Sequence, residues 1–232
     1  MFCLGFQKIA KKDERPEPLV PMVKGLGAGV LAGTGLGLAA TLHGHKKYTP
    51  EQSADTYNKI KKHRSLDVHR LDLGSGIPAH AKASWMPTSS GHGMVNLANN
   101  ANPAVVAHEL GHAHHLGNMS KTHRNLHLSS RLVGPAAGIG LAAGLANSKD
   151  PDKRKWAPAA VLAGSAPTLY QEGRASVHAV HDLNRHLGRK AALRGAGRLG
   201  VAFGSYAAIP AAVAYALHKN NKKLEANNKS RK

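Results

Sequence analysis

The chain has 232 residues, which is enough for one ordinary domain with appended segments. Its 32 Lys and Arg against 13 Asp and Glu give a formal net charge of +19, which suits anionic partners (nucleic acid or acidic lipid headgroups) and equally suits solvated basic tails. The one cysteine, Cys3, excludes an internal disulfide and a thiolate-rich zinc site, so any metal must be held by histidines and carboxylates.

Residues 1–22 are predicted to be a basic, proline-rich tail. Pro16, Pro18 and Pro21 oppose a helix there. We do not expect a secretory signal, because the charged stretch is too long and the apolar run that follows begins too late.

Residues 23–42 predict a transmembrane helix. Apart from Lys24 the run is uncharged, and its length suits a bilayer span of about 20 residues. Glycines recur every fourth residue from Gly25 to Gly37, which lines one helix face with small residues, as in GxxxG packing. The alternative is a glycine-rich flexible or buried segment, because glycine weakens a helix in water.

Residues 48–190 are predicted to hold the main domain. A helix begins near Thr49 and Pro50 and ends near His63, and residues 66–73 alternate like a strand. Residues 74–76 mark a turn, and residues 84–98 suggest a loop followed by a short strand at 93–97.

Residues 103–116 give the most convincing helix. Asn102 can cap its start, Pro103 suits its first turn, and Gly117 is expected to close it.

Apolar runs dominate the rest of the chain. The runs 132–147 and 156–169 are short for full spans and predict an apolar helical hairpin over 132–169, re-entrant or half-buried. Residues 168–187 look helical again. An apolar helix is expected over 191–217, as a tilted span or a surface helix, before a basic tail at 218–232.

The sequence His108-Glu109-Leu110-Gly111-His112 matches the H-E-x-x-H pattern of zinc peptidases. Residues four apart share a helix face, so His108 and His112 can grip one Zn²⁺ ion. Glu109 would act as general base: it would take a proton from the attacking water and pass it to the leaving amine. Chance occurrence in a histidine-rich chain is the competing explanation.

A catalytic zinc ion needs a third protein ligand. Position 118 is Asn rather than the His that the metzincin pattern requires, so a later carboxylate is expected. The acids that follow His112 are Asp150, Asp152, Glu172, Asp182 and Glu225. We predict that Glu172 is the third ligand, because it lies in the helical segment after the hairpin. The alternative role for Glu172 is a surface ion pair with Arg174.

The stretches VVAHELGHAHH (105–115) and EGRASVHAV (172–180) resemble the membrane gluzincins, meaning the HtpX and CAAX-prenyl-protease group and the YugP-type metallopeptidases. The resemblance implies an α+β zincin-like core, Glu172 as zinc ligand, and a strand near Met94–Leu97 as the edge strand that receives a substrate peptide. One departure is Ser176, which stands where the family often has Asp, so carboxylate support of a zinc-binding histidine is missing.

The predicted oxyanion-stabilising residue is His178, six residues after Glu172; a polar-face histidine is the alternative. The predicted fold is mainly α with a small β-sheet, plus Gly/Ala-rich apolar helices associated with a membrane. The predicted function is a zinc metalloendopeptidase acting on a protein or peptide substrate, with membrane lipids as further partners. The alternative is a non-enzymatic basic membrane-inserting structural or virion protein. Nucleic acid would bind only through nonspecific charge, because no recognition motif is present.

Overall fold

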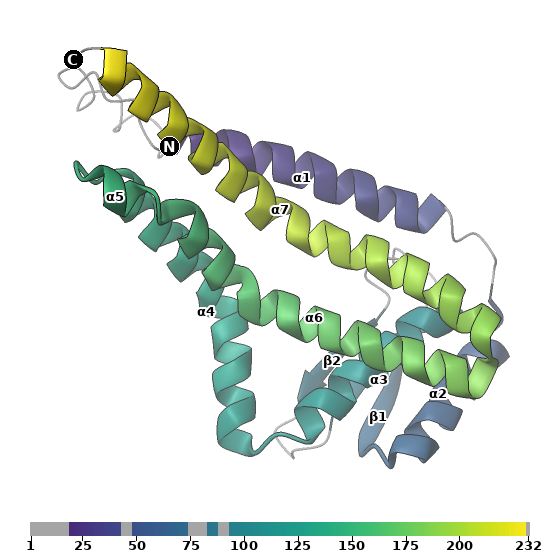
Figure 1. The fold of residues 1–232 in the computed structure, drawn as a ribbon. Helices are drawn as coiled ribbons and strands as arrows, with labels where there is room; N and C mark the ends of the chain where they lie inside the picture. The colour runs from purple at the N-terminus through teal and green to yellow at the C-terminus, as the bar shows by residue number, and fades with distance from the viewer. Residues whose placement is uncertain (1–18, 43–47, 74–82, 88–92, 231–232) are drawn as a thin grey trace, which may run out of the picture.

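A computed structural model describes residues 19–42, 48–73, 83–87 and 93–230 of the chain (Figure 1). Within these residues the fold is mainly helical with one small sheet, as the sequence predicts. The elements in chain order are α1 (Leu19–Leu42), α2 (Pro50–Arg64), β1 (Val68–Leu73), β2 (Ala83–Pro87), β3 (Gly93–Ala98), α3 (Pro103–Gly117), α4 (Lys121–Ala146), α5 (Pro151–Arg154), α6 (Ala157–Leu187) and α7 (Arg189–Ser230). Residues 1–18 of the predicted tail 1–22, and the predicted turn 74–76, lie outside the described residues.

Helix α2 begins as its sequence predicts. The Thr49 hydroxyl accepts a hydrogen bond from the Gln52 amide at 3.3 Å, and the Gln52 side chain accepts one from the Thr49 amide at 3.2 Å. This reciprocal pair satisfies two amides that a helix start leaves without partners. At the other end of α2, the Arg64 guanidinium donates to both carboxylate oxygens of the fully buried Asp182, at 3.0 and 2.7 Å, and so ties α2 to α6.

The sheet has three strands in the order β1-β3-β2, with β1 parallel and β2 antiparallel to β3. Strands β1 and β3 confirm two predictions. Strand β2 corrects the prediction of a loop at residues 84–92: its five residues end in Pro87 and lie beside turn-forming residues, so only pairing with β3 reveals it. The expectation that Met94–Leu97 is an edge strand is wrong, because β3 is paired on both sides.

Helix α3 lies between the sheet and α6 and carries the main hydrophobic core (Figure 1). The fully buried side chains of Val106 and Leu110 on α3 belong to one cluster with Val95 and Leu97 of β3 and with Leu183 of α6. Burying each such side chain contributes about 1.5–3 kcal/mol, which is enough to fix the position of α3 on both neighbours. Asn102 caps α3 as predicted, by accepting from the Ala104 amide at 2.8 Å, but Gly117 is an ordinary helical residue and Asn118 is the C-cap.

The long helices α1, α4, α6 and α7 pack through small residues. A Cβ on Gly25 of α1 would lie 2.6 Å from the Val213 Cα of α7, so the predicted glycine face does permit a close helix contact. Gly138 of α4 makes the same kind of approach to α6, where a Cβ would lie 2.8 Å from the Gly164 Cα. A second hydrophobic cluster joins all four helices through Met22, Ala142, Val161, Val213 and Leu217.

Four helices run further than predicted. Helix α4 begins at Lys121, eleven residues before the predicted run 132–147. Helix α1 already begins at Leu19, because Pro21 falls in its first turn, where a missing N–H costs nothing. Helix α6 is continuous through Pro167, so the predicted run 156–169 and the helix after it are one element. Helix α7 begins at Arg189, passes Pro210 and continues into the residues predicted as a basic tail.

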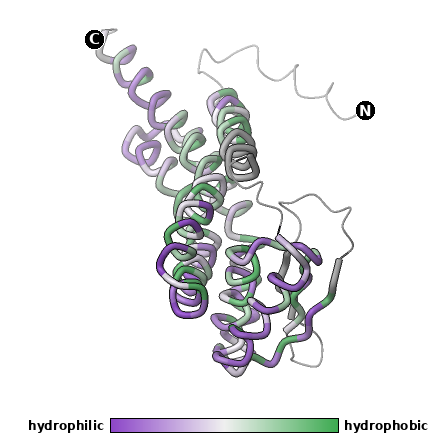
Figure 2. The backbone as a smooth tube through the Cα atoms, turned by 90° about the vertical axis from the view of Figure 1, so that its right-hand side faces the viewer, coloured by the Kyte–Doolittle hydropathy of each residue, from purple (hydrophilic) through white to green (hydrophobic). Residues whose placement is uncertain are grey.

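Two helices are long and apolar enough to cross a membrane by length and composition: Lys121–Ala146 and Arg189–Asn228. In α1 the described apolar part, Val20–Ala32, is shorter than a span. Large apolar side chains on these helices are exposed, among them Leu31 (75%) and Leu132 (79%). Hydrophobic residues follow the long helices, whereas hydrophilic residues gather toward the C-terminal end of α7 (Figure 2). These features are weak evidence for membrane association and confirm no particular span.

Candidate metal centre

Helix α3 presents His108 and His112 on one face, as their spacing predicts. The two rings are 4.6 Å apart and nearly perpendicular, and their Nε2 atoms are separated by 3.1 Å. Because α3 is fixed by its cap and by burial against the sheet, both imidazoles are held before any ion binds.

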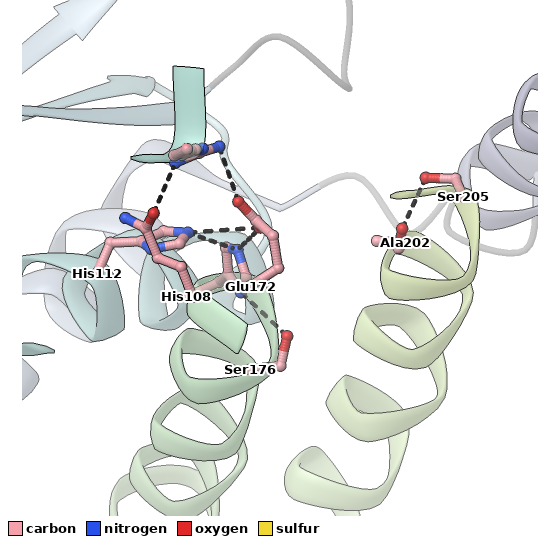
Figure 3. A network of polar contacts seen from close by, with 8 residues as sticks. His108, His112, Glu172, Ser176, Ala202 and Ser205 are labelled. Atoms are coloured by element: carbon pink, nitrogen blue, oxygen red, sulfur yellow. Dashed lines mark hydrogen bonds and ion pairs between the residues drawn. The ribbon is translucent and has the colours of Figure 1, made fainter. Parts of the chain in front are cut away.

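Helix α6 supplies the third group, Glu172. Its Oε2 lies 3.2 Å from His108 Nε2 and 3.5 Å from His112 Nε2 (Figure 3). The three donor atoms lie within 4.8 Å of one another, and in the described part of the chain these residues form a group that could hold a metal ion. Two imidazole nitrogens and a carboxylate oxygen that converge in this way are a donor set that zinc accepts. The predicted trio is therefore brought together; the structure leaves the identity of the ion open.

Arg131 of α4 is a residue that the sequence did not reveal. Its Nη2 donates to Glu172 Oε1 at 2.8 Å and its Nη1 to Gln171 Oε1 at 3.4 Å. The partner of Glu172 is thus Arg131 rather than the Arg174 weighed above. Burial alone would raise the pKa of Glu172, but hydrogen bonds from His108 and His112 outweigh it and hold that pKa well below its ordinary value. Glu172 is a carboxylate at neutral pH, as a metal ligand must be.

Ser176, one turn after Glu172 on α6, takes the place of the missing carboxylate. Its Oγ lies 3.3 Å from Nδ1 of His108 (Figure 3). A partner on the outer nitrogen of a ligating histidine fixes the tautomer and the ring orientation, and a hydroxyl performs this role more weakly than a carboxylate. Ser176 therefore supports His108 at its outer nitrogen, but less strongly than a carboxylate at the same position would.

Glu109, the predicted general base, follows His108 and is buried, with 9% exposure. Burial raises its pKa, and the nearby charges of His112 and His108 oppose that rise. A raised pKa brings a carboxyl group closer to the working pH and suits it to accept and return a proton.

The close contact between α3 and α6 depends on Gly111. A Cβ at this position would lie 2.6 Å from the carbonyl oxygen of Ala175 and 3.1 Å from its Cα. Because Ala175 lies between Glu172 and Ser176 on α6, Gly111 sets how close these two residues come to the histidines.

His178 lies elsewhere. Its ring packs edge-on against His114 at 5.0 Å, on the side of α3 where Arg64 approaches, and the structure gives it no contact with the trio. Burial, with the charges of Arg64, His114 and Arg174, lowers the pKa of His178 to about 4, so it is neutral at pH 7. This geometry supports the alternative that His178 is a histidine on the polar face of α6 that packs against α3. It does not support the predicted role of His178 in stabilising an oxyanion.

Three of the four other acids considered as ligands have different partners, and the fourth, Glu225, lies near the C-terminal end of α7. Asp182 is held by Arg64, as described above. Asp150 caps α5, and Asp152 pairs with Lys155 at 2.8 Å on the surface. These contacts leave Glu172 as the acid that reaches the two histidines.

No family model, curated protein or solved structure matches this chain. The resemblance to membrane gluzincins therefore rests on the residues of the two motifs.

Proposed function

We propose that the protein is a zinc-dependent metalloendopeptidase with a zincin-like core, related to the membrane gluzincins. The observation that carries the proposal is the convergence of His108, His112 and Glu172 from two helices, with Glu109 buried next to His108. The spacing in the sequence explains only why the two histidines share a helix face. Glu172 lies 60 residues after His112, so its position beside them is an independent observation. A catalytic zinc site requires such a third ligand.

Each residue of the site has a distinct task. Zinc, when bound, would polarise the substrate carbonyl and make a water molecule a better nucleophile at neutral pH. His108, His112 and Glu172 would hold the ion, and Arg131 and Ser176 would orient Glu172 and His108. Glu109 would remove the proton of the attacking water and deliver it to the nitrogen of the leaving amine.

The substrate would be an extended polypeptide. Since β3 is central, strand addition would use β2, the outer antiparallel strand of the sheet, which lies next to α3. The exposed apolar side chains of the long helices and the charge of +19 support a location at an anionic membrane.

The test is cleavage of unfolded casein by the full chain in anionic phospholipid vesicles. Glu109→Gln should keep its zinc and lose at least about 10²-fold in rate, because a positioned base contributes that much. Glu51→Gln, which alters an exposed glutamate of α2, is the matched control and should cleave like the wild type. Undiminished cleavage by Glu109→Gln, or none by the zinc-loaded wild type, would contradict the proposal.

The second candidate is a non-enzymatic, membrane-inserting protein. It is favoured by the exposed apolar side chains, for example Val23 (64%) on α1 and Leu141 (59%) on α4. The discriminating measurement is dye release from the same vesicles. Release that survives His108→Ala, together with no proteolysis by the wild type, would favour this candidate over the peptidase.

A further inference from the structure

Two histidines outside the proposed zinc centre face each other between α3 and α4. His115 lies in the last turn of α3, and His127 lies in the second turn of α4. Their ring centroids are 5.7 Å apart and the rings are nearly perpendicular, at 81°. Tyr170 of α6 lies on a third side, with its ring 5.8 Å from His115 and 6.3 Å from His127.

Both histidines have an unpaired, buried nitrogen. Among the described residues, Nε2 of His115 and Nε2 of His127 are each shielded from solvent and have no hydrogen-bond partner. Leaving a buried polar atom unpaired costs about 1–3 kcal/mol, so a partner shared by both nitrogens would remove two such costs. Burial also lowers the pKa of His115, which leaves its ring neutral and its lone pair free at pH 7.

The ring separation fits a shared ion. A zinc–nitrogen bond of ~2.1 Å places the centroid of an imidazole ~3.2 Å from the metal, so two ligating rings lie ~5 to 6 Å apart for bond angles from tetrahedral to wide. The observed 5.7 Å falls in this range. Edge-to-face packing gives similar separations but leaves both nitrogens without a partner.

We propose that His115 and His127 form a second metal site, selective for a divalent transition-metal ion of the zinc type. Imidazole is a preferred ligand of Zn²⁺, and water would complete the coordination beside Tyr170. With two protein nitrogens instead of three protein ligands, this site binds more weakly than the first. Tyr170 is 55% exposed, so the site lies close to the surface of the protein.

The site lies on the three helices that build the first centre, one helical turn away. His115 is three residues from His112, and His127 is four residues from Arg131, the partner of Glu172. An ion here would join the end of α3 to the start of α4. It would therefore stabilise the helix that carries Arg131 when the concentration of free zinc is high.

The test is zinc titration of the full chain by equilibrium dialysis and elemental analysis. The wild type should bind one zinc tightly and a second more weakly. In the double variant His115→Ala/His127→Ala, the dissociation constant of the more weakly bound zinc should rise at least 10-fold. His123→Ala/His181→Ala removes two exposed histidines of α4 and α6 and is the matched control, which should bind like the wild type. His127→Gln, which keeps most of the side-chain volume, should show the same weakening if the alanine pair folds poorly.

A third variant separates this proposal from the proposed function. His108→Ala/His112→Ala should lose the tight zinc and keep the weaker one. Equal binding by the wild type and by both His115/His127 variants, or an equal loss in the His123/His181 control, would overturn the second site. Absence of the tight zinc with the weaker one intact would instead refute the first centre alone.

Discussion

Replacing Gly111 by Ala is the sharpest test of how the two site helices are held together. The added methyl carbon would lie 2.6 Å from the carbonyl oxygen of Ala175, whereas a carbon and a carbonyl oxygen approach to ~3.3 Å, so the helices must separate by about 0.7 Å. This carbonyl oxygen belongs to the backbone of α6 and cannot rotate away as the end of a side chain could. Overpacking of this kind costs about 1–3 kcal/mol of unfolding free energy.

The same displacement would carry Glu172 and Ser176 away from the histidines. Metal–ligand distances tolerate about 0.2 Å, which is less than a third of the required movement. We therefore expect Gly111→Ala to weaken zinc binding by about 10- to 100-fold, as loss of the support of a ligand does. Zinc affinity by competition with a chelator, and unfolding by urea, measure the two effects.

The matched control is Gly117→Ala on the same helix, where a methyl group meets nothing within 4 Å. Alanine is the better helix former, so this variant should be as stable as the wild type or up to about 1 kcal/mol more stable, with unchanged zinc affinity. If Gly111→Ala bound zinc and unfolded like Gly117→Ala, the close contact of α3 with α6 would not hold the site.

Three further predictions concern Ser176 and Arg131, which contact the proposed ligands, and His178, which does not. Ser176→Ala should weaken zinc binding by about 10-fold relative to the wild type. Ser176→Asp should bind zinc as tightly as the wild type or more tightly, because a carboxylate supports His108 better than a hydroxyl. Chelator competition would measure both affinities, and equal zinc affinity in the wild type and both variants would contradict this role of Ser176. Arg131→Gln should lower the thermal midpoint of the zinc-free protein more than that of the zinc-loaded protein, since bound zinc would be a second cation beside the buried Glu172 and would reduce the cost of losing Arg131. Scanning calorimetry with and without zinc would detect this, and equal shifts would refute it. The pKa of His178 is about 4 in the folded protein, below its ordinary value of 6.5. As the pH falls, the unfolded chain therefore binds this proton before the folded protein does. The free energy of unfolding then decreases as the pH drops below 6.5. His178→Gln should lose less stability than the wild type between pH 7 and pH 5 in urea unfolding, with unchanged zinc content; an identical loss would show that His178 does not titrate in this way.

The local parts of the fold could be predicted from the sequence. Helices α2 and α3 carry their own start signals, at Thr49 and Asn102, and the helical spacing of His108 and His112 fixes their common face. Glu172 could be predicted because few acids follow the motif, and Asp150, Asp152 and Glu225 lie in a charged loop or in the basic C-terminal segment. Asp182, on the same helix as Glu172, was the remaining alternative, and its ion pair with Arg64 appears only in the structure.

The features that were missed depend on contacts between distant segments. Strand β2 gains its hydrogen bonds from β3, and the role of Arg131 appears only when α4 packs on α6. An arginine at the start of an apolar run was the available sign, since a charge in such a position needs a partner. The location of His178 was missed because six residues along a helix turn the side chain away from Glu172.

The three-ligand zinc centre is the central claim, and zinc content tests it most directly. The wild type, His108→Ala, Glu172→Ala and the control Glu51→Gln would be loaded with zinc, dialysed against metal-free buffer and measured by elemental analysis. We predict one retained zinc per chain in the wild type and the control, and little or none in the other two variants. No retained zinc in the wild type, or full retention in Glu172→Ala, would contradict the account.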